Sequence, residues 1–208
     1  MSKVHLCCGD IYLKDYINVD IIGFTMSKDG KSALRREGIL EVLDFSKTGG
    51  NPNETTLDKY FRYPFEPDPA KRIRRPFIVD RLHNILTKWP FGDKALDEVV
   101  MISCIEHFDP KTELPHILKE LNRTVKVGGK LIIDWPDVVK QVEQYKDTDP
   151  EFMMELIYCN HKNKYSIHHW GFTEKTFPNY LGKNWSYEFK EIVKHDYPMM
   201  GCVATRIS

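Results

Sequence analysis

The first residues suited to ligand chemistry form a glycine turn followed by an acid. The turn is Leu6–Asp10, in which Gly9 lets the backbone approach a ligand and presents N–H groups to an anionic or carboxylate end. Asp20 ends a second apolar stretch, where a carboxylate accepts hydrogen bonds from both hydroxyls of a ribose. The turn lacks the longer glycine fingerprint that clears space for a pyrophosphate. These features indicate a nucleoside cofactor without a pyrophosphate.

Three histidines are candidate general bases, because imidazole titrates near neutral pH. They are His107, His168 and His169, and Glu106 and Asp134 are acids that could orient one of them or receive an acceptor. Two alternatives stay open. Glu106 and His107 could cap the following helix and fix its loop, and the histidine pair could have a structural or surface role.

The cysteines do not predict a metal or redox site. They stand at positions 7, 8, 104, 159 and 202, form no C-x-x-C pair and are odd in number. Two adjacent thiols without companions do not form a zinc site. We therefore expect reduced thiols and no bound metal.

Short β-branched runs must position these groups. Phe77–Asp80, Leu96–Ser103 and Lys130–Asp134 resemble strands that are buried on both faces of a parallel sheet, and we expect them to be central strands. Apolar residues from Leu114 to Val125 recur at spacings of three and four, which predicts a helix with Gly128-Gly129 as its stop. Strand, helix and strand form a βαβ unit, so the fold class is α/β.

The C-terminal third predicts two further helices and a closing antiparallel pair. The helices are expected near residues 150–160 and 174–181, and the strands at Tyr187–Val193 and Gly201–Ile207. Asp137 is expected to cap the helix that follows it. In an open α/β sheet, ligands bind beyond the carboxyl ends of the strands at the switch point, so the loops after the strands should hold the site.

Size and composition indicate one domain, residues 1–208, with an insertion at about 23–76. The chain has 208 residues, 30 basic and 30 acidic side chains, and no apolar run of the ~18 residues that span a bilayer. We expect a cytoplasmic protein with no membrane partner. The insertion contains the aromatic residues 60–65 and the cations of Lys71–Arg75. These residues form either a binding surface for an anionic or planar ligand, or a loop whose aromatic side chains pack on the domain while its cations face water.

Several segments, taken in order, resemble the class I S-adenosylmethionine-dependent methyltransferases, and in particular the type-11-like group with a short first loop. These segments cover about three-fifths of the chain: Leu6–Asp20, Thr87–Asp93, Leu96–Val100, Ser103–Phe108 and Leu118–Ile133, with His168–Thr173 matching some members. The resemblance implies a Rossmann-like, doubly wound, mainly parallel seven-stranded sheet with an antiparallel C-terminal strand. It also implies S-adenosylmethionine as cofactor.

By this resemblance the cofactor-binding residues lie in four places. Cys7, Gly9 and Asp10 surround the methionine end, Asp20 binds the ribose, Asn84 or Ile85 borders the adenine, and Ser103 and Cys104 line the pocket. The chain departs from the family at Cys7, where a glycine is usual, and at Asn84, where an acid often stands. The amide oxygen of Asn84 can still accept a hydrogen bond from an adenine amino group.

The resemblance implies in-line methyl transfer to a small-molecule or glycan acceptor, with the base drawn from His107, His168 or His169. One alternative is a non-catalytic binding or scaffold protein on the same fold. Another is aminopropyl transfer, although Ser103-Cys104-Ile105, after the fourth strand, lacks the acids that such enzymes typically use to bind a polyamine. The balanced charge argues against a nucleic-acid acceptor, and the cations of Lys71–Arg75 argue for one. The sequence does not predict an oligomeric state.

Overall fold

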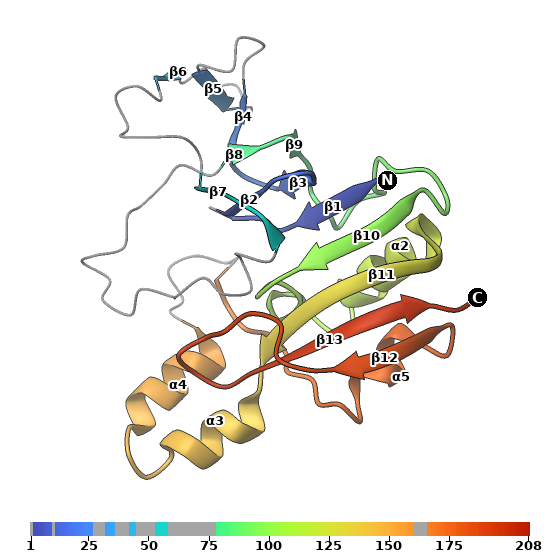
Figure 1. The fold of residues 1–208 in the computed structure, drawn as a ribbon. Helices are drawn as coiled ribbons and strands as arrows, with labels where there is room; N and C mark the ends of the chain where they lie inside the picture. The colour runs from blue at the N-terminus through green and yellow to red at the C-terminus, as the bar shows by residue number, and fades with distance from the viewer. Residues whose placement is uncertain are drawn as a thin grey trace.

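The computed structural model describes residues 2–9, 11–26, 32–35, 42–44, 53–57, 78–159 and 166–208, and its centre is a seven-stranded sheet (Figure 1). The strand order is β12-β13-β11-β10-β1-β3-β9. The strands are β1 (Lys3–Leu6), β3 (Ile17–Asp20), β9 (Arg81–Leu82), β10 (Leu96–Met101), β11 (Val125–Pro136), β12 (Trp185–Phe189) and β13 (Met199–Arg206). Strands β1, β3, β9, β10 and β11 run parallel, and β13 runs antiparallel to both of its neighbours. The predicted fold class is confirmed.

Strands β10 and β11 are apolar because side chains from both of their faces are buried. Val99 and Leu131 point into one core cluster, and Val100 and Ile132 into another. Successive residues of a strand face opposite sides of a sheet, so a strand with two covered faces is apolar throughout. Their β-branched runs therefore mark them as central.

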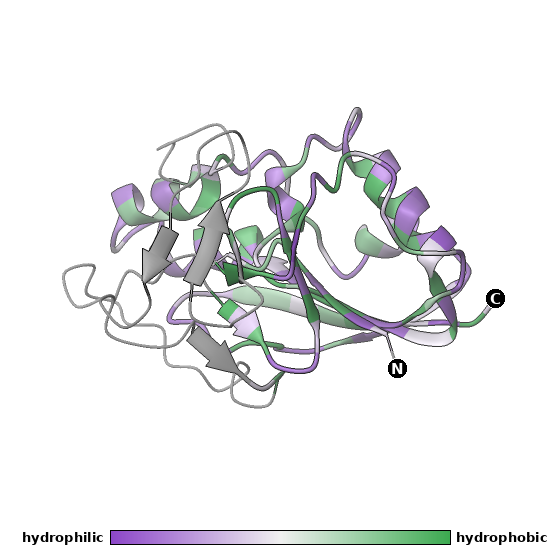
Figure 2. Ribbon diagram, turned by 90° about the horizontal axis from the view of Figure 1, so that it is seen from above, coloured by the Kyte–Doolittle hydropathy of each residue, from purple (hydrophilic) through white to green (hydrophobic). Residues whose placement is uncertain are grey.

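The two faces of the sheet are covered differently. On one face, α2 (Leu114–Thr124) and α5 (Phe177–Leu181) bury their apolar residues in the larger core cluster. On the other, segments outside the helices supply Leu13, Tyr16, Ile192 and Val193. In Figure 2 the helices carry both purple and green residues, as amphipathic surface helices do.

Helices α3 (Val138–Tyr145) and α4 (Pro150–Tyr158) form an antiparallel pair beyond the end of β11 (Figure 1). Asp137 caps α3 as predicted, since its carboxylate accepts a hydrogen bond from Lys140 N at 3.2 Å. The rings of Tyr145 and Phe152 meet edge to face. The expected helices near 150–160 and 174–181 are confirmed with shorter bounds.

Two predictions about the sheet were wrong. Gly128-Gly129 does not stop the helix, because α2 ends at Thr124 and β11 begins at the next residue. The glycines lie in a bulge where the pairing between β10 and β11 shifts register, and Gly128 has a φ of 80°. The run Phe77–Asp80 is not a central strand, since β8 (Ile78–Val79) pairs with β4 outside the main sheet.

The expected insertion contains strands among its described residues. A second sheet has the order β6-β5-β4-β8, with β4 (Phe24–Met26), β5 (Ser32–Arg35) and β6 (Val42–Asp44), and β2 (Ile11–Leu13) pairs in parallel with β7 (Asn53–Thr55). The aromatic residues 60–65 and the cations of Lys71–Arg75 lie outside the described residues. Among the described helices, none has the length and apolar character needed to cross a bilayer.

Candidate cofactor and acceptor site

The turn after β1 is held by the acid at the end of β3. Gly9 N–H donates to Asp20 Oδ2 at 3.0 Å, and Ile22 N–H donates to Asp20 Oδ1 at 3.2 Å. Burial raises the pKa of Asp20, and hydrogen bonds from the backbone N–H groups of Gly9, Ile22 and Ile21 partly offset this effect. Each carboxylate oxygen has a second lone pair, which suits the two hydroxyls of a ribose.

Two residues of the turn, Cys7 and Gly9, have a left-handed backbone conformation. Cys7 has a φ of 53° and Gly9 a φ of 55°. A side chain at position 7 therefore carries the strain that glycine avoids, of roughly 1 kcal/mol. A Cβ placed on Gly9 would meet no heavy atom of the described part of the chain within 4 Å, beyond its own neighbours in sequence, which leaves space for a ligand beside the turn. Asp10, also predicted to contact the cofactor, lies outside the described residues.

Cys7 and Cys104 are joined by a disulfide, which corrects the expectation that all thiols are reduced. They follow β1 and β10, which are neighbouring parallel strands, and their Cα atoms are 6.1 Å apart. Although 97 residues separate them in the chain, the topology brings them to the same edge of the sheet. The two predicted cofactor residues therefore meet at the switch point.

The turn after β9 brings Asn84 and Ile85 beside Asp20, because His83 N–H donates to Asp20 O at 2.9 Å. Asn84 Oδ1 accepts Leu86 N–H at 2.9 Å, so the amide oxygen predicted to meet an adenine also closes its own turn. Ile85 is buried in the larger core cluster. The two residues are near the cofactor turn, and their contact with an adenine stays a prediction.

Asp134, one of the two acids expected to orient a histidine, contacts His195, which sequence reasoning missed. Ser103 N–H donates to Asp134 Oδ1 at 2.7 Å, and Asp134 Oδ2 lies 3.3 Å from His195 Nε2. Asp134 is 1% exposed at the end of β11. His195 is 61 residues away in the connection between β12 and β13, where no local motif marks it. The carboxylate thus links the predicted cofactor loop to the C-terminal segment.

Two of the predicted bases form a cluster with Glu106. Glu106 and His107 lie in the short helix η1 (Ile105–His107), and the ring of His168 packs edge-on against that of His107 with centroids 4.8 Å apart. Burial lowers the pKa of His107, and burial with His107 nearby lowers that of His168 to about 4. Burial raises the pKa of Glu106 well above its usual value. The capping alternative is wrong, because α2 begins only after Glu113.

The third predicted base, His169, is placed differently. Its backbone N–H donates to Glu106 O at 2.7 Å, which ties the C-terminal segment to the end of β10. Its side chain is exposed, whereas His168 beside it is half-buried. His169 is thus the member of the three that can exchange a proton directly with solvent.

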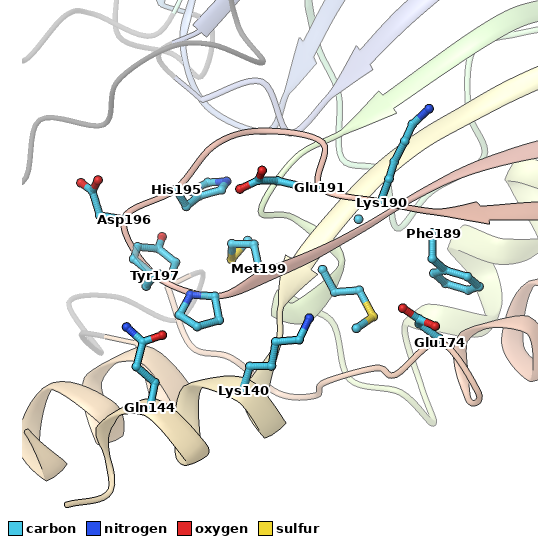
Figure 3. Close-up of a pocket in the computed structure, with 13 residues that line it drawn as sticks. Lys140, Gln144, Glu174, Phe189, Lys190, Glu191, His195, Asp196, Tyr197 and Met199 are labelled. Atoms are coloured by element: carbon cyan, nitrogen blue, oxygen red, sulfur yellow. The ribbon is translucent and has the colours of Figure 1, made fainter. Parts of the chain in front are cut away.

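A cavity of about 430 Å³ opens beyond the ends of β11 and β13 (Figure 3). Lys140 and Gln144 reach it from α3, and Tyr197 and His195 from the connection between β12 and β13. None of the predicted site residues lines it. His195 nevertheless connects the cavity through Asp134 to Ser103 and so to the cofactor loop.

Comparison with known proteins shows that part of the chain, and its fold, are similar to methyltransferases. The sequence model of a methyltransferase domain matches residues 65–133, which include β10, α2 and most of β11. An S-adenosylmethionine-dependent methyltransferase from Methanosarcina mazei is 14% identical, with 99% of this chain and 92% of that chain aligned and a TM-score of 0.52. A putative one from Listeria monocytogenes is 13% identical, with 100% and 91% aligned and a TM-score of 0.48. No curated protein sequence matches significantly.

Proposed function

We propose that the chain is a class I S-adenosylmethionine-dependent methyltransferase that methylates a small-molecule or glycan acceptor held in the cavity beyond β11 and β13. The methyltransferase-domain match over residues 65–133 and the shared fold support this proposal. S-adenosylmethionine supplies a methyl group on a sulfonium, which a nucleophile displaces in line. The protein's own task is to hold both partners, exclude water and remove a proton from the acceptor.

One observation supports the proposal: the buried carboxylate of Asp134 contacts both Ser103, in the loop after β10, and His195, which lines the cavity. Gly9 and Asp20 offer a backbone N–H turn and a ribose acceptor at the ends of β1 and β3. After β10, the backbone N–H of Ser103 donates to Asp134, and the other carboxylate oxygen of Asp134 contacts His195, which lines the cavity. A donor at the turn and an acceptor in the cavity would face each other across the loop after β10.

The lining of the cavity favours a small polar acceptor over a polyanion. Its volume lies within the range of small-molecule sites. Lys140 and Lys190 are outnumbered by three acids, Glu174, Glu191 and Asp196. Phe189 and Tyr197 add aromatic surface. A nucleic-acid site needs an excess of cations to neutralise phosphates. None of the three predicted bases lines the cavity, so in this proposal His195, which lines it and contacts Asp134, takes the acceptor proton.

The test begins with thermal unfolding in S-adenosylmethionine, its demethylated product or NAD. A ligand at ~100 times its Kd adds roughly 2.7 kcal/mol, which is about 5–10 °C for a chain of this size. We expect shifts with the first two compounds and none with NAD. The absence of a shift with all three would leave the non-catalytic alternative.

The second stage follows labelled methyl groups from the cofactor into fractionated metabolites, oligosaccharides and oligonucleotides. Gln144→Ala, which alters the cavity wall, should raise the KM for the acceptor severalfold and leave cofactor affinity unchanged. Glu143→Ala is the matched control, because Glu143 is on the same helix but does not line the cavity. Labelling confined to oligonucleotides, or equal kinetics in both variants, would contradict the proposed acceptor site.

A further inference from the structure

Glu106, His107 and His168 form a cluster with the composition of a metal site. Each contributes one potential ligand atom, and these atoms lie within 4.8 Å of one another. The cluster joins two distant segments, which are tied by the hydrogen bonds from His169 N–H and Trp170 N–H to Glu106 O, at 2.7 and 3.3 Å. Two imidazoles and one carboxylate are a common ligand set for transition metals.

In both imidazole rings, Nδ1 contacts a backbone carbonyl. His107 Nδ1 lies 3.0 Å from Ile167 O, and His168 Nδ1 lies 2.9 Å from Leu156 O. A carbonyl oxygen only accepts, so both Nδ1 atoms carry the proton and both Nε2 atoms keep a lone pair. Metal-bound histidines typically donate their second N–H to such a backbone carbonyl, which fixes the tautomer and the ring.

Glu106 provides the independent evidence for a ligand. Its side chain is 1% exposed, and Oε2 has no hydrogen-bond partner among the described residues. The neighbouring charged group, Asp134, is a second acid and cannot compensate a carboxylate. A buried carboxylate oxygen without a partner costs free energy, which a bound cation would offset.

We propose that Glu106, His107 and His168 bind one divalent transition-metal ion, such as Zn²⁺, Co²⁺, Mn²⁺ or Fe²⁺, at the carboxyl end of β10. Ligand bonds of about 2.0–2.2 Å need ligand atoms roughly 3–3.5 Å apart, so the three side chains must draw together on binding. Mg²⁺ prefers an all-oxygen shell and is expected to bind poorly.

Three protein ligands leave coordination positions for water or for an oxygen of the acceptor. This part of the inference rests on the proposed function, whereas the metal site does not. A hydroxyl bound to the ion loses its proton more readily. The proton would leave to solvent, the new O–C bond would form to the methyl carbon, and the S–C bond of the cofactor would break with its electron pair remaining on sulfur.

The test is a metal titration of the full chain after removal of metals with EDTA. We expect one Co²⁺ per chain, seen by visible absorption, with displacement by Zn²⁺ and not by Mg²⁺. His168→Ala should weaken Co²⁺ binding by more than about 100-fold, since loss of a mere supporting contact costs 10- to 100-fold. His169→Ala is the matched control and should stay within about twofold of the parent protein.

Glu106→Gln separates a metal ligand from a structural acid. It removes the charge and keeps the shape, so it should weaken Co²⁺ binding strongly without lowering the melting temperature. The site would be overturned if the parent, His168→Ala and Glu106→Gln proteins bound Co²⁺ with equal affinity. It would also be overturned by an absorption band from a thiolate-to-cobalt bond, or by the absence of Co²⁺ binding. The thermal shift with S-adenosylmethionine, measured on the same samples, reports separately whether the proposed cofactor function holds.

Discussion

Replacing Asp20 with asparagine tests the cofactor turn most directly. The carboxylate accepts Gly9 N–H through one oxygen and Ile22 N–H through the other. Asparagine keeps one acceptor oxygen and turns an NH₂ group toward one of these donors or toward a ribose hydroxyl. Hydrogen bonds to charged groups contribute about 1.5–3 kcal/mol each. A loss of about 2–3 kcal/mol corresponds to a Kd roughly 30- to 150-fold higher.

The assay is isothermal titration with the demethylated cofactor product, which binds without turnover. Asp80→Asn is the control, because Asp80 accepts Asn18 N–H at 2.7 Å and the Tyr12 hydroxyl at 2.6 Å in the same region. It should lower stability and leave the Kd unchanged. A product analogue without the 2′-hydroxyl should bind the parent protein more weakly and show little further loss with Asp20→Asn. A Kd for Asp20→Asn within threefold of the parent value, or equal losses in both variants, would refute the ribose assignment.

Two further predictions concern stability. Burial lowers the pKa of His5 to about 4 from the ordinary 6.5, so the unfolded chain binds the extra proton between these pH values. The free energy of unfolding should fall by roughly 3 kcal/mol from this group as the pH drops from 7 to 4, and denaturant titrations of His5→Gln should lack this part of the slope. The disulfide between Cys7 and Cys104 should leave two fewer alkylated cysteines before reduction than after, counted by mass spectrometry of the denatured chain. Cys104→Ser should lower the free energy of unfolding by about 4 kcal/mol, as expected for a loop of ~100 residues; equal alkylation would show that the bond does not form.

The sheet was predictable where sequence pattern and burial coincide. Strands β10 and β11 have apolar residues on both faces, and α2 has an apolar stripe, so each leaves a local signal. Gly128-Gly129 was misread because a glycine pair is equally suited to a helix stop and to a bulge. The pairing of β10 with β11 shifts register there, and only the partner strand determines which role applies.

The sequence predicted which loops form the candidate site, but not which side chains in them contact each other. Gly9 and Asp20 follow two strands, and the structure joins them as expected. The disulfide between Cys7 and Cys104 depends on β1 and β10 being neighbours, which no spacing in the sequence encodes. His195 reaches Asp134 only through the return of the chain after β12, so local reasoning left it out.

The unequal covering of the sheet has a consequence for hydrogen exchange. The face opposite α2 is closed by Leu13 and Tyr16 and by Ile192 and Val193, which lie outside the helices. Segments with fewer buried contacts open at a lower free energy than the core strands, as separate cooperative units. Since the connection between β12 and β13 also forms a wall of the cavity, it can open for an acceptor while the amides of β1, β10 and β11 stay protected. An acceptor bound in the cavity would raise the free energy of opening of the connection between β12 and β13. A compound that slows amide exchange in this connection alone would therefore be identified as the acceptor.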